Sequence, residues 1–389
     1  MTDTRTDDPV AAAIALAPQI KAAKDEIQAQ STLPNSLVKA MAEANLFQLF
    51  VPRSIGGPET DPITAFLAVE ELSKVDGSVG WCSFVASAIS IYSAWLPADV
   101  GGEMFDQPLD IRAAGSFRPT ADARPSDGGY LIGGRWNYVS GSDHANWLVL
   151  NCNIVGDSGP VFDSQGGPVT RVMIVPRSVA MVEKTWHTLG MRGTGSNDVV
   201  IEEAFVPNEH TCLLYGAAAT DGPLYEPRTV TATGWTPFAA MGLGIARGAM
   251  DTFVRLATSS GSTTSPTLIR DRTAVQTVVG ETEAIISGAR AYALDAVGEM
   301  WESASRGDLD PGPQILQARL AITHAVRESV RAVDMLFYAA GTNAIHESND
   351  LEQYFRDIHT AGQHIAALHS NFEYGGQLLL GLPHGASGW

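Results

Sequence analysis

A series of short, β-rich segments in the middle of the chain decides the fold, and GGYLIGGRWNYVSG (residues 128–141) is the first of them. NWLVLNCNIV (146–155), VTRVMIVP (169–176) and DVVIEEAFVP (198–207) follow. Each segment concentrates β-branched and aromatic residues, and Gly, Pro, Asp and Asn separate one segment from the next, which is typical of strands and turns. Residues 113–215 are therefore predicted to form a β-domain.

The segments on either side of this zone have helical periodicity instead. Apolar residues recur at helical spacing within residues 1–112, namely Leu37, Met41, Ala42 and Leu46, then Ile63, Phe66, Leu67 and Leu72. The same spacing returns within residues 216–389, where one stripe contains Leu316, Leu320, Val326, Val330, Val333 and Phe337. Helices and strands are thus segregated, which favours an α+β protein over a doubly wound nucleotide-binding fold.

Composition and charge exclude several classes of partner. The chain has 389 residues, with 25 basic and 43 acidic side chains and a formal net charge of −18, so nucleic acid and anionic membranes would repel it. Residues 77–98 carry no charge, but five serines and Pro97 favour a buried helix of a soluble protein over a membrane span. The N-terminus lacks the basic start of a signal peptide, so we expect a cytoplasmic protein.

Cysteines and the common cofactor motifs exclude further functions. Cys82, Cys152 and Cys212 are too few and too far apart for a disulfide framework or a zinc site, and no metal is expected. No strand is followed by G-x-G-x-x-G, since Gly242, Gly244 and Gly248 have the wrong spacing and a helical context. A resident nicotinamide nucleotide is therefore not expected.

Polar residues that could contact a ligand gather in the turn of GGRWNYVSGSDHANW (133–147). Ser140 and Ser142 could donate to a ligand, and Gly141 between them would let a ligand approach the backbone. A hairpin turn that uses these residues for its own hydrogen bonds is the alternative. AGSFRPTADARP (114–125) would lie beside this segment if the two strands pair, and WHTLGMRGTGSNDV (186–199) adds a second polar turn.

These motifs occur together and in an order that resembles the acyl-CoA dehydrogenase superfamily. The motifs are GSVGW (77–81), AGSFRP (114–119), GGRWNYVSGSDHANW, LGMRGTGSNDVVIEEAFVP (189–207) and RDIHTAGQH (356–364). Within that superfamily the chain is similar to oxygenase components of two-component flavin-dependent monooxygenases. The resemblance implies an N-terminal helical domain, a central β-barrel domain and a C-terminal four-helix bundle, assembled as a homotetramer.

The resemblance also implies a chemistry. A separate NAD(P)H-dependent flavin reductase would supply reduced FMN or FAD (FMNH2 or FADH2), which would bind between the β-domain and the bundle. O2 as co-substrate would form a C4a-hydroperoxyflavin, and the protein would exclude water and orient a small phenol-like or indole-like aromatic substrate.

Roles for individual residues follow from the same resemblance. Ser140 is expected to hydrogen-bond the flavin near N5, and His364 to stabilise or protonate the peroxide, in a neutral or a protonated form. His144 would support the turn or line the pocket. Arg356 and Asp357 are expected to form an ion pair on the side of a helix. The wider set of flavin-binding candidates is Phe117, Ser140, Ser142, Gly193, Thr194, Gln276, Gly341, Thr342 and Asn343.

The substrate is expected to lie against aromatic side chains. Trp81, Phe117 and His364 are candidate contacts, and so is Tyr92, which occupies the position where phenol-hydroxylating relatives place a histidine. Tyr92 could hydrogen-bond an indole N–H or a carbonyl, or it could pack in the core with its hydroxyl satisfied. Phe84, Trp136 and Trp147 would complete an aromatic wall, although such residues often belong to the core.

An FAD-dependent acyl-CoA dehydrogenase is the main alternative. In those enzymes a glutamate stands eight residues before the arginine of the R-D pair, where this chain has Ser348, which cannot serve as the base. Glu347 is adjacent, but one residue turns a helix by about 100°. Ser265 also replaces the arginine of the flavin-binding R-x-x-F-G motif, so tightly bound FAD is not expected.

Overall fold

The computed structural model describes residues 8–105, 109–262, 265–307 and 312–383. Helices dominate the first part of the chain, and the uncharged segment forms α4 followed by a 3-10 turn, η2, rather than the single helix expected over 77–98. The elements are α1 (Pro9–Gln30), α2 (Asn35–Glu43), α3 (Pro62–Val75), α4 (Gly77–Ser90), η2 (Ile91–Trp95) and α5 (Ala98–Met104). Asp76 caps α4, because its carboxylate accepts from the backbone N–H groups of Ser78 and Val79.

The middle of the chain forms one eight-stranded mixed sheet. Its order is β6-β7-β2-β1-β3-β5-β8, with β4 paired to β3. As expected for two adjacent strands, β1 and β2 form an antiparallel hairpin whose turn contains Gly128 at φ +73°. The strands are β1 (Ala113–Ser126), β2 (Gly129–Val139), β3 (Trp147–Gly156), β4 (Gly159–Pro160), β5 (Thr170–Pro176), β6 (Met181–Glu183), β7 (Asn197–Pro207) and β8 (Thr211–Cys212).

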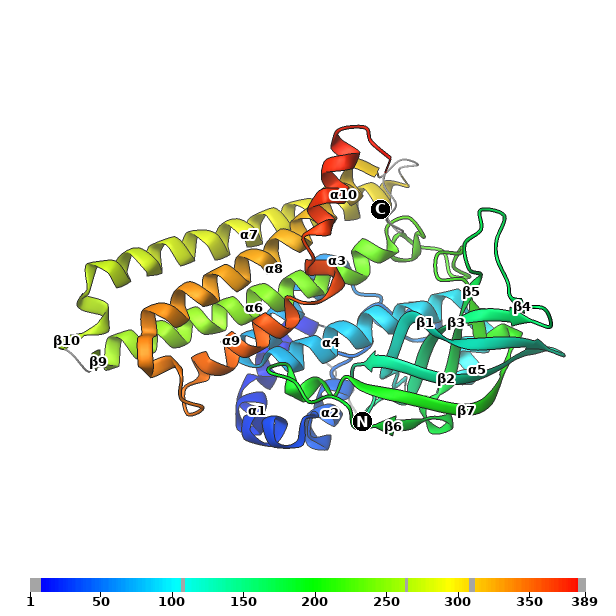
Figure 1. Ribbon diagram of the computed structural model, residues 1–389, viewed down its shortest axis with the longest axis horizontal. Helices are drawn as coiled ribbons and strands as arrows, with labels where there is room; N and C mark the ends of the chain where they lie inside the picture. Colours follow the sequence, from blue (N-terminus) through cyan, green and yellow to red (C-terminus); the bar gives the residue numbers. More distant parts are fainter. Residues whose placement is uncertain (1–7, 106–108, 263–264, 308–311, 384–389) are drawn as a thin grey trace.

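The last part of the chain is a bundle of long helices that extends away from the sheet (Figure 1). Gly244 lets α6 approach α3 closely, since a Cβ there would lie 2.5 Å from the Glu70 carbonyl oxygen. The elements are α6 (Val230–Ser259), β9 (Gly261–Ser262), β10 (Ser265–Leu268), α7 (Thr273–Arg306), α8 (Gly312–Ala340), α9 (Asp350–Ala361) and α10 (Ser370–Leu379). In the described part of the chain no helix is long and apolar enough to cross a membrane.

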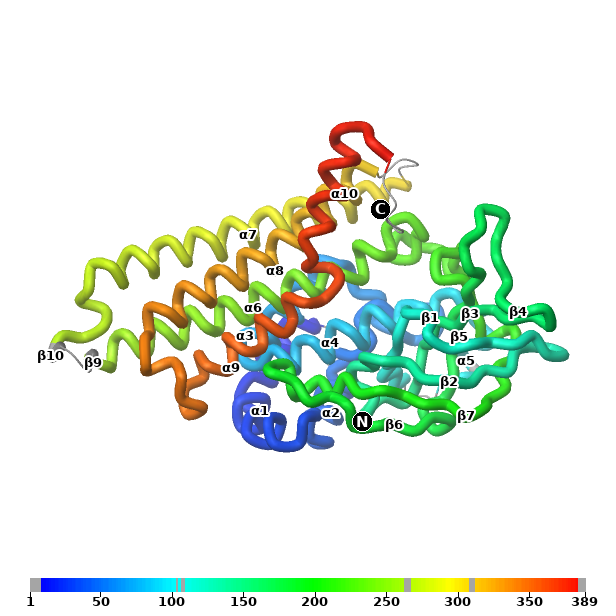
Figure 2. Tube along the Cα trace, in the orientation of Figure 1, coloured from blue at the N-terminus to red at the C-terminus, as the bar shows by residue number. Residues whose placement is uncertain are grey.

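This architecture confirms the predicted α+β fold class, in which helices precede and follow a β-rich middle. The domain boundaries 1–112, 113–215 and 216–389 stay predictions, although β1 and β8 both lie within the middle range. Between β6 and β7 the chain leaves the sheet and runs toward α4 and α9, as the tube in Figure 2 shows. The candidate site lies where this excursion, α4 and the segment after α9 meet.

Candidate active site

A continuous hydrogen-bonded relay runs through the junction of α4, β2 and the β6–β7 excursion. The Trp81 indole N–H donates to Ser140 Oγ over 3.0 Å, and Ser140 Oγ lies 2.6 Å from Ser196 Oγ. Ser196 Oγ lies 2.7 Å from Thr194 Oγ1, which donates to the Met191 carbonyl oxygen over 2.9 Å. Ser140, Ser196 and Thr194 are all buried.

The direction of each bond in the relay follows from proton counting, because a hydroxyl has one hydrogen and two lone pairs. The Thr194 hydrogen points at a carbonyl, so Thr194 accepts from Ser196, and Ser196 in turn accepts from Ser140. Ser140 therefore spends its hydrogen on Ser196 and one lone pair on Trp81. Its second lone pair can accept one further hydrogen bond.

His364 lies in an aromatic cage that shares Trp81 with the relay. Its ring centroid lies 5.4 Å from that of Trp81 and 4.8 Å from that of Phe238. Phe84 and Trp235 complete the cage, each with its ring centroid 6.3 Å from the imidazole. Helices α4 and α6 supply the four aromatic side chains, whereas His364 follows α9.

The protonation of His364 is set by its surroundings. Burial lowers the pKa of His364 to about 4, so the imidazole is neutral at pH 7. Its Nδ1 accepts from the Ala366 backbone N–H over 3.3 Å, which places the single ring hydrogen on Nε2. Of the two forms expected from the sequence, the neutral one is present, and it offers a donor.

Tyr92 and Phe117 form a second aromatic contact, 5.0 Å between ring centroids. Tyr92 also lies 4.8 Å from Trp95, and its hydroxyl donates to the Leu214 carbonyl oxygen over 3.0 Å. Burial raises the pKa of Tyr92, so the hydroxyl stays protonated. This geometry favours the packing interpretation of Tyr92 over a direct contact with substrate.

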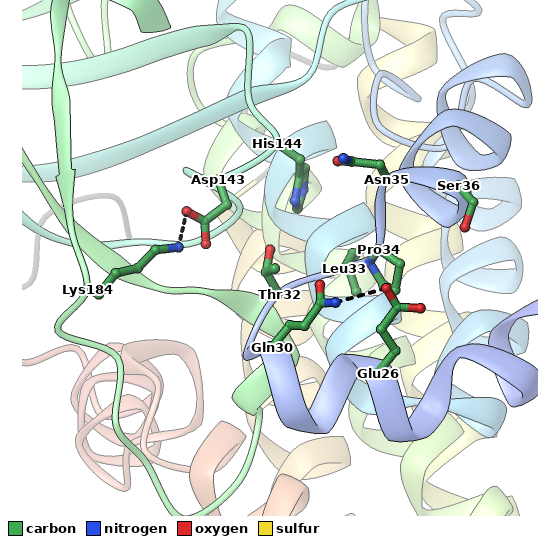
Figure 3. A pocket seen from close by; sticks show the side chains of 10 residues that line it. All are labelled: Glu26, Gln30, Thr32, Leu33, Pro34, Asn35, Ser36, Asp143, His144 and Lys184. Atoms are coloured by element: carbon green, nitrogen blue, oxygen red, sulfur yellow. Dashed lines mark hydrogen bonds and ion pairs between the residues drawn. The ribbon is translucent and has the colours of Figure 1, made fainter.

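His144 points into a different region of the molecule from Ser140. It lines a recess of about 430 Å³ together with the end of α1, the start of α2 and the Asp143–Lys184 ion pair (Figure 3). Burial, with a smaller contribution from the Arg112 cation, lowers the pKa of His144 to about 4. Its Nδ1 is buried without a hydrogen-bond partner, and its ring centroid lies 5.4 Å from that of Phe47.

Other flavin-binding candidates from the two polar turns have contacts within the fold. Ser142 is buried and donates to the Gly195 carbonyl oxygen over 3.3 Å. Gly193 lies against α1, and a Cβ at this position would come 2.2 Å from Ile27 Cγ2. Of these residues only Thr194 belongs to the relay.

The remaining candidates lie at the far end of the bundle. The start of α7, which carries Gln276, and the turn η8 (Gly341–Ala344) both lie at the end remote from the large sheet (Figure 1). Gln276, Gly341 and Thr342 are exposed, and Asn343 lines a second recess of about 430 Å³ together with Arg255 and His346. One copy of the chain therefore does not bring them to Ser140.

Two residue pairs bear on the dehydrogenase alternative and on the expected Arg356–Asp357 ion pair. Glu347 and Ser348 are exposed in the turn before α9, so neither lies beside the cage as a buried base. The expected ion pair does not form, because Arg356 pairs with Glu352 whereas Asp357 is buried and accepts from the Met191 N–H.

Sequence analysis did not identify several residues of this site. Ser196 stands in the polar turn 186–199, so composition pointed to the segment but not to the residue. Trp235 and Phe238 sit on α6 at positions typical of a helical core, and nothing in their spacing indicates a cage. Groups of Asp, Glu, His or Cys suited to holding a metal ion are absent among the described residues.

Comparisons with known proteins show which family this chain belongs to. Residues 11–96 match the N-terminal domain of acyl-CoA dehydrogenases, and residues 236–368 match their C-terminal domain. Indole-3-acetate monooxygenase of Pseudomonas putida is 31% identical over 92% of this chain and 89% of its own length. The oxygenase subunit HsaA, a flavin-dependent monooxygenase of Rhodococcus jostii, is 27% identical over 90% of this chain and 92% of its own.

A solved structure extends the comparison to three dimensions. XiaF from Streptomyces, in complex with FADH2 and glycerol, has a TM-score of 0.88 and 27% identity, covering 96% of this chain and 95% of XiaF. Fold, site and relatives together define a flavin-dependent monooxygenase, the oxygenase component of a two-component system. The chain belongs to the acyl-CoA dehydrogenase family.

Proposed function

We propose that this chain binds reduced flavin from an NAD(P)H-dependent flavin reductase and uses O2 to oxygenate a small indole-like or phenol-like aromatic compound. When bound, reduced flavin supplies the electrons that activate O2. The observation that carries the proposal is the polarity of Ser140, which can only accept a further hydrogen bond. Reduced flavin carries a hydrogen on N5 and oxidised flavin does not, so this hydroxyl suits the reduced form.

The protein's own groups have three tasks in this proposal. Ser140 accepts a hydrogen bond from reduced flavin, and His364 offers a neutral N–H donor to an oxygen atom bound in front of it. Trp81, Phe84, Trp235 and Phe238 exclude water around His364 and provide an apolar surface for a planar substrate. The monooxygenases similar to this chain include one named for indole-3-acetate and a resorcinol hydroxylase, which supports an aromatic substrate.

An anaerobic titration with FMNH2, FADH2 and both oxidised forms tests the proposal. We expect a reduced flavin to bind at least about tenfold more tightly than its oxidised form, the scale of one hydrogen bond to a matched partner. Mixing the complex with oxygenated buffer and indole should then give oxygenated indole with little hydrogen peroxide. Tight binding of oxidised FAD, followed by its reduction on addition of an acyl-CoA, would instead establish the dehydrogenase alternative.

We also propose a homotetramer that works in the cytoplasm. Gln276, Gly341, Thr342 and Asn343 lie at the end of the bundle remote from the sheet, so a second copy would have to bring them to a flavin bound at Ser140. The three cysteines are free and buried, which suits a reducing compartment. Light scattering on the eluting peak of a sizing column tests the assembly, and a monomer of 41.3 kDa would contradict it.

A further inference from the structure

A pair of buried carboxylates lies directly behind the end of the relay. Asp357 of α9 and Asp76 at the N-terminus of α4 are 0% and 1% exposed. The Gln353 side-chain amide lies between them and donates to Asp76 Oδ2 over 2.8 Å and to Asp357 Oδ2 over 3.3 Å. The other oxygen of Asp357 accepts from the Met191 backbone N–H over 2.5 Å. Asp357 thus reaches the residue at which the relay ends.

Met191 has a conformation that needs such support. Its φ of +54° lies in the left-handed region, which costs a residue other than glycine roughly 1 kcal/mol or more. Asp357 fixes its N–H, while its carbonyl accepts from the Thr194 hydroxyl over 2.9 Å and from the Trp186 indole over 2.9 Å. Without the Asp357 bond, the carbonyl that accepts from Thr194 would be free to turn.

Helix α9 holds both halves of the candidate site. The Gly190 N–H donates to Thr360 Oγ1 over 3.0 Å, and the Arg356 guanidinium donates to the Leu189 carbonyl oxygen over 2.9 Å. His364 follows the end of the same helix by three residues. The way in which residues 189–194 pack against α9 therefore sets where the relay lies relative to the cage around His364.

The charge of this carboxylate pair depends on pH. Burial and, to a smaller extent, the neighbouring Asp76 carboxylate together raise the pKa of Asp357 to about 7, against smaller opposing effects of the Met191 N–H, Arg356 and Gln353. Burial also raises the pKa of Asp76, although Gln353, the N–H groups that it caps and Lys24 of α1 oppose this rise. Tyr354 of α9 and Cys82 of α4 also face the pair, and both have raised pKa values and stay neutral.

We propose that Asp357 is a positioning residue for the relay, in that it holds Met191 and thereby fixes the hydrogen bonds that leave Ser140 as an acceptor. The inference rests on the proposed function, because it assigns a role at the site where reduced flavin is proposed to bind. As the pH rises through about 7, Asp357 loses its proton beside the buried Asp76 carboxyl group, and residues 189–194 are expected to shift relative to α9.

The first test needs no flavin, so it can fail independently of the proposed function. Trp186 reports on the loop because its indole bonds the Met191 carbonyl, and 5-fluorotryptophan makes it visible by fluorine NMR. The Trp186→Phe variant assigns its resonance, and a His187→Gln background removes the neighbouring imidazole. We expect this resonance to titrate near pH 7 with Asp357 present and to stay flat in Asp357→Asn. A flat resonance with Asp357 present, or an unchanged titration in Asp357→Asn, overturns the proposal.

The second test measures reduced-flavin binding and the fraction of O2 lost as hydrogen peroxide. Asp357→Asn keeps an acceptor for the Met191 N–H and mimics the protonated acid, so both quantities should stay within about threefold of the parent and lose their dependence on pH around 7. Asp357→Ala removes the acceptor, and the dissociation constant for reduced flavin should rise about tenfold. A folded Asp357→Ala protein that binds and couples like the parent overturns the proposal.

A matched control separates positioning from general damage to the bundle. Asp334 of α8 also contacts α9, because it pairs with His359 on the partly exposed outer face of α9. Asp334→Asn is therefore expected to leave the fluorine titration, the flavin affinity and the peroxide fraction unchanged. If Asp357→Ala fails to fold, the pH dependence in Asp357→Asn decides the question, because a purely structural loss would not abolish a titration.

Discussion

Ser140 and His144 stand four residues apart in one turn, yet they serve two different regions. On one side of the turn Ser140 joins Trp81 and the cage around His364, and on the other His144 lies against Phe47 in the recess behind α1 and α2. Burial lowers the pKa of both His144 and His364 to about 4. A lowered pKa therefore reports burial alone, and the contacts of each ring separate a candidate catalytic group from a packed one.

The largest expected effect concerns the histidine of the cage. Replacing His364 by alanine removes the N–H donor, and product formation should fall about 100-fold, the lower range for a lost acid–base group. Reduced flavin should still bind, so the lost product should appear as hydrogen peroxide, measured by a peroxidase-coupled assay. The same replacement at His144 should lower stability and leave the peroxide fraction near that of the parent. Equal peroxide release from both variants would remove the distinction between the two regions.

A smaller effect is expected for the hydroxyl that faces the flavin. Ser140→Ala leaves the Trp81 indole and Ser196 without their partner, and reduced flavin should bind about tenfold more weakly. Ser142 is the matched control, since it is buried in the same turn but donates only to the Gly195 carbonyl oxygen. Anaerobic titration of both variants checks this, and equal losses would show that the turn acts as a whole.

An effect on stability, with none expected on catalysis, sharpens the role of the recess. The pKa of His144 falls from 6.5 in the unfolded chain to about 4 in the fold, so the unfolded chain binds more protons between these values. The free energy of unfolding therefore decreases as the pH falls from 6.5 toward 4, and His144 accounts for a decrease of about 3 kcal/mol in all. Above pH 6.5 His144 is neutral in both states and causes no such decrease. His144→Phe should remove this loss, seen as a flatter profile of urea midpoints between pH 4 and pH 6.5. An unchanged profile would mean that His144 is solvated.

The parts of the fold that local pattern determines could be predicted from the sequence. Period and turn residues located the helical and β-rich zones, and the stripe from Leu316 to Phe337 lies on α8. The expectation of one helix over 77–98 was wrong beyond Ser90, because the uncharged composition did not show that the regular helix gives way to the 3-10 turn η2.

The candidate site was only partly predictable, because its geometry depends on segments far apart in the sequence. Ser140 and His364 were proposed from motifs, and the structure places both beside Trp81. The direction of the relay required the contact between Thr194 and Met191, and the role of Asp357 required the fold to bring α9 to residue 191. The expected Arg356–Asp357 ion pair does not form for a local reason, since neighbouring residues on a helix point in different directions.

The one-way relay has a consequence for the end of each catalytic cycle under the proposed function. Once the cofactor has been spent, its N5 atom offers a lone pair where it had a hydrogen. Ser140 cannot answer with its own hydrogen, because that hydrogen is committed to Ser196. Two acceptors then face each other in a buried place, which weakens the binding of oxidised flavin. The fixed direction of the hydrogen bonds among three hydroxyls would thus favour exchange, because the protein retains reduced flavin and releases oxidised flavin to the reductase.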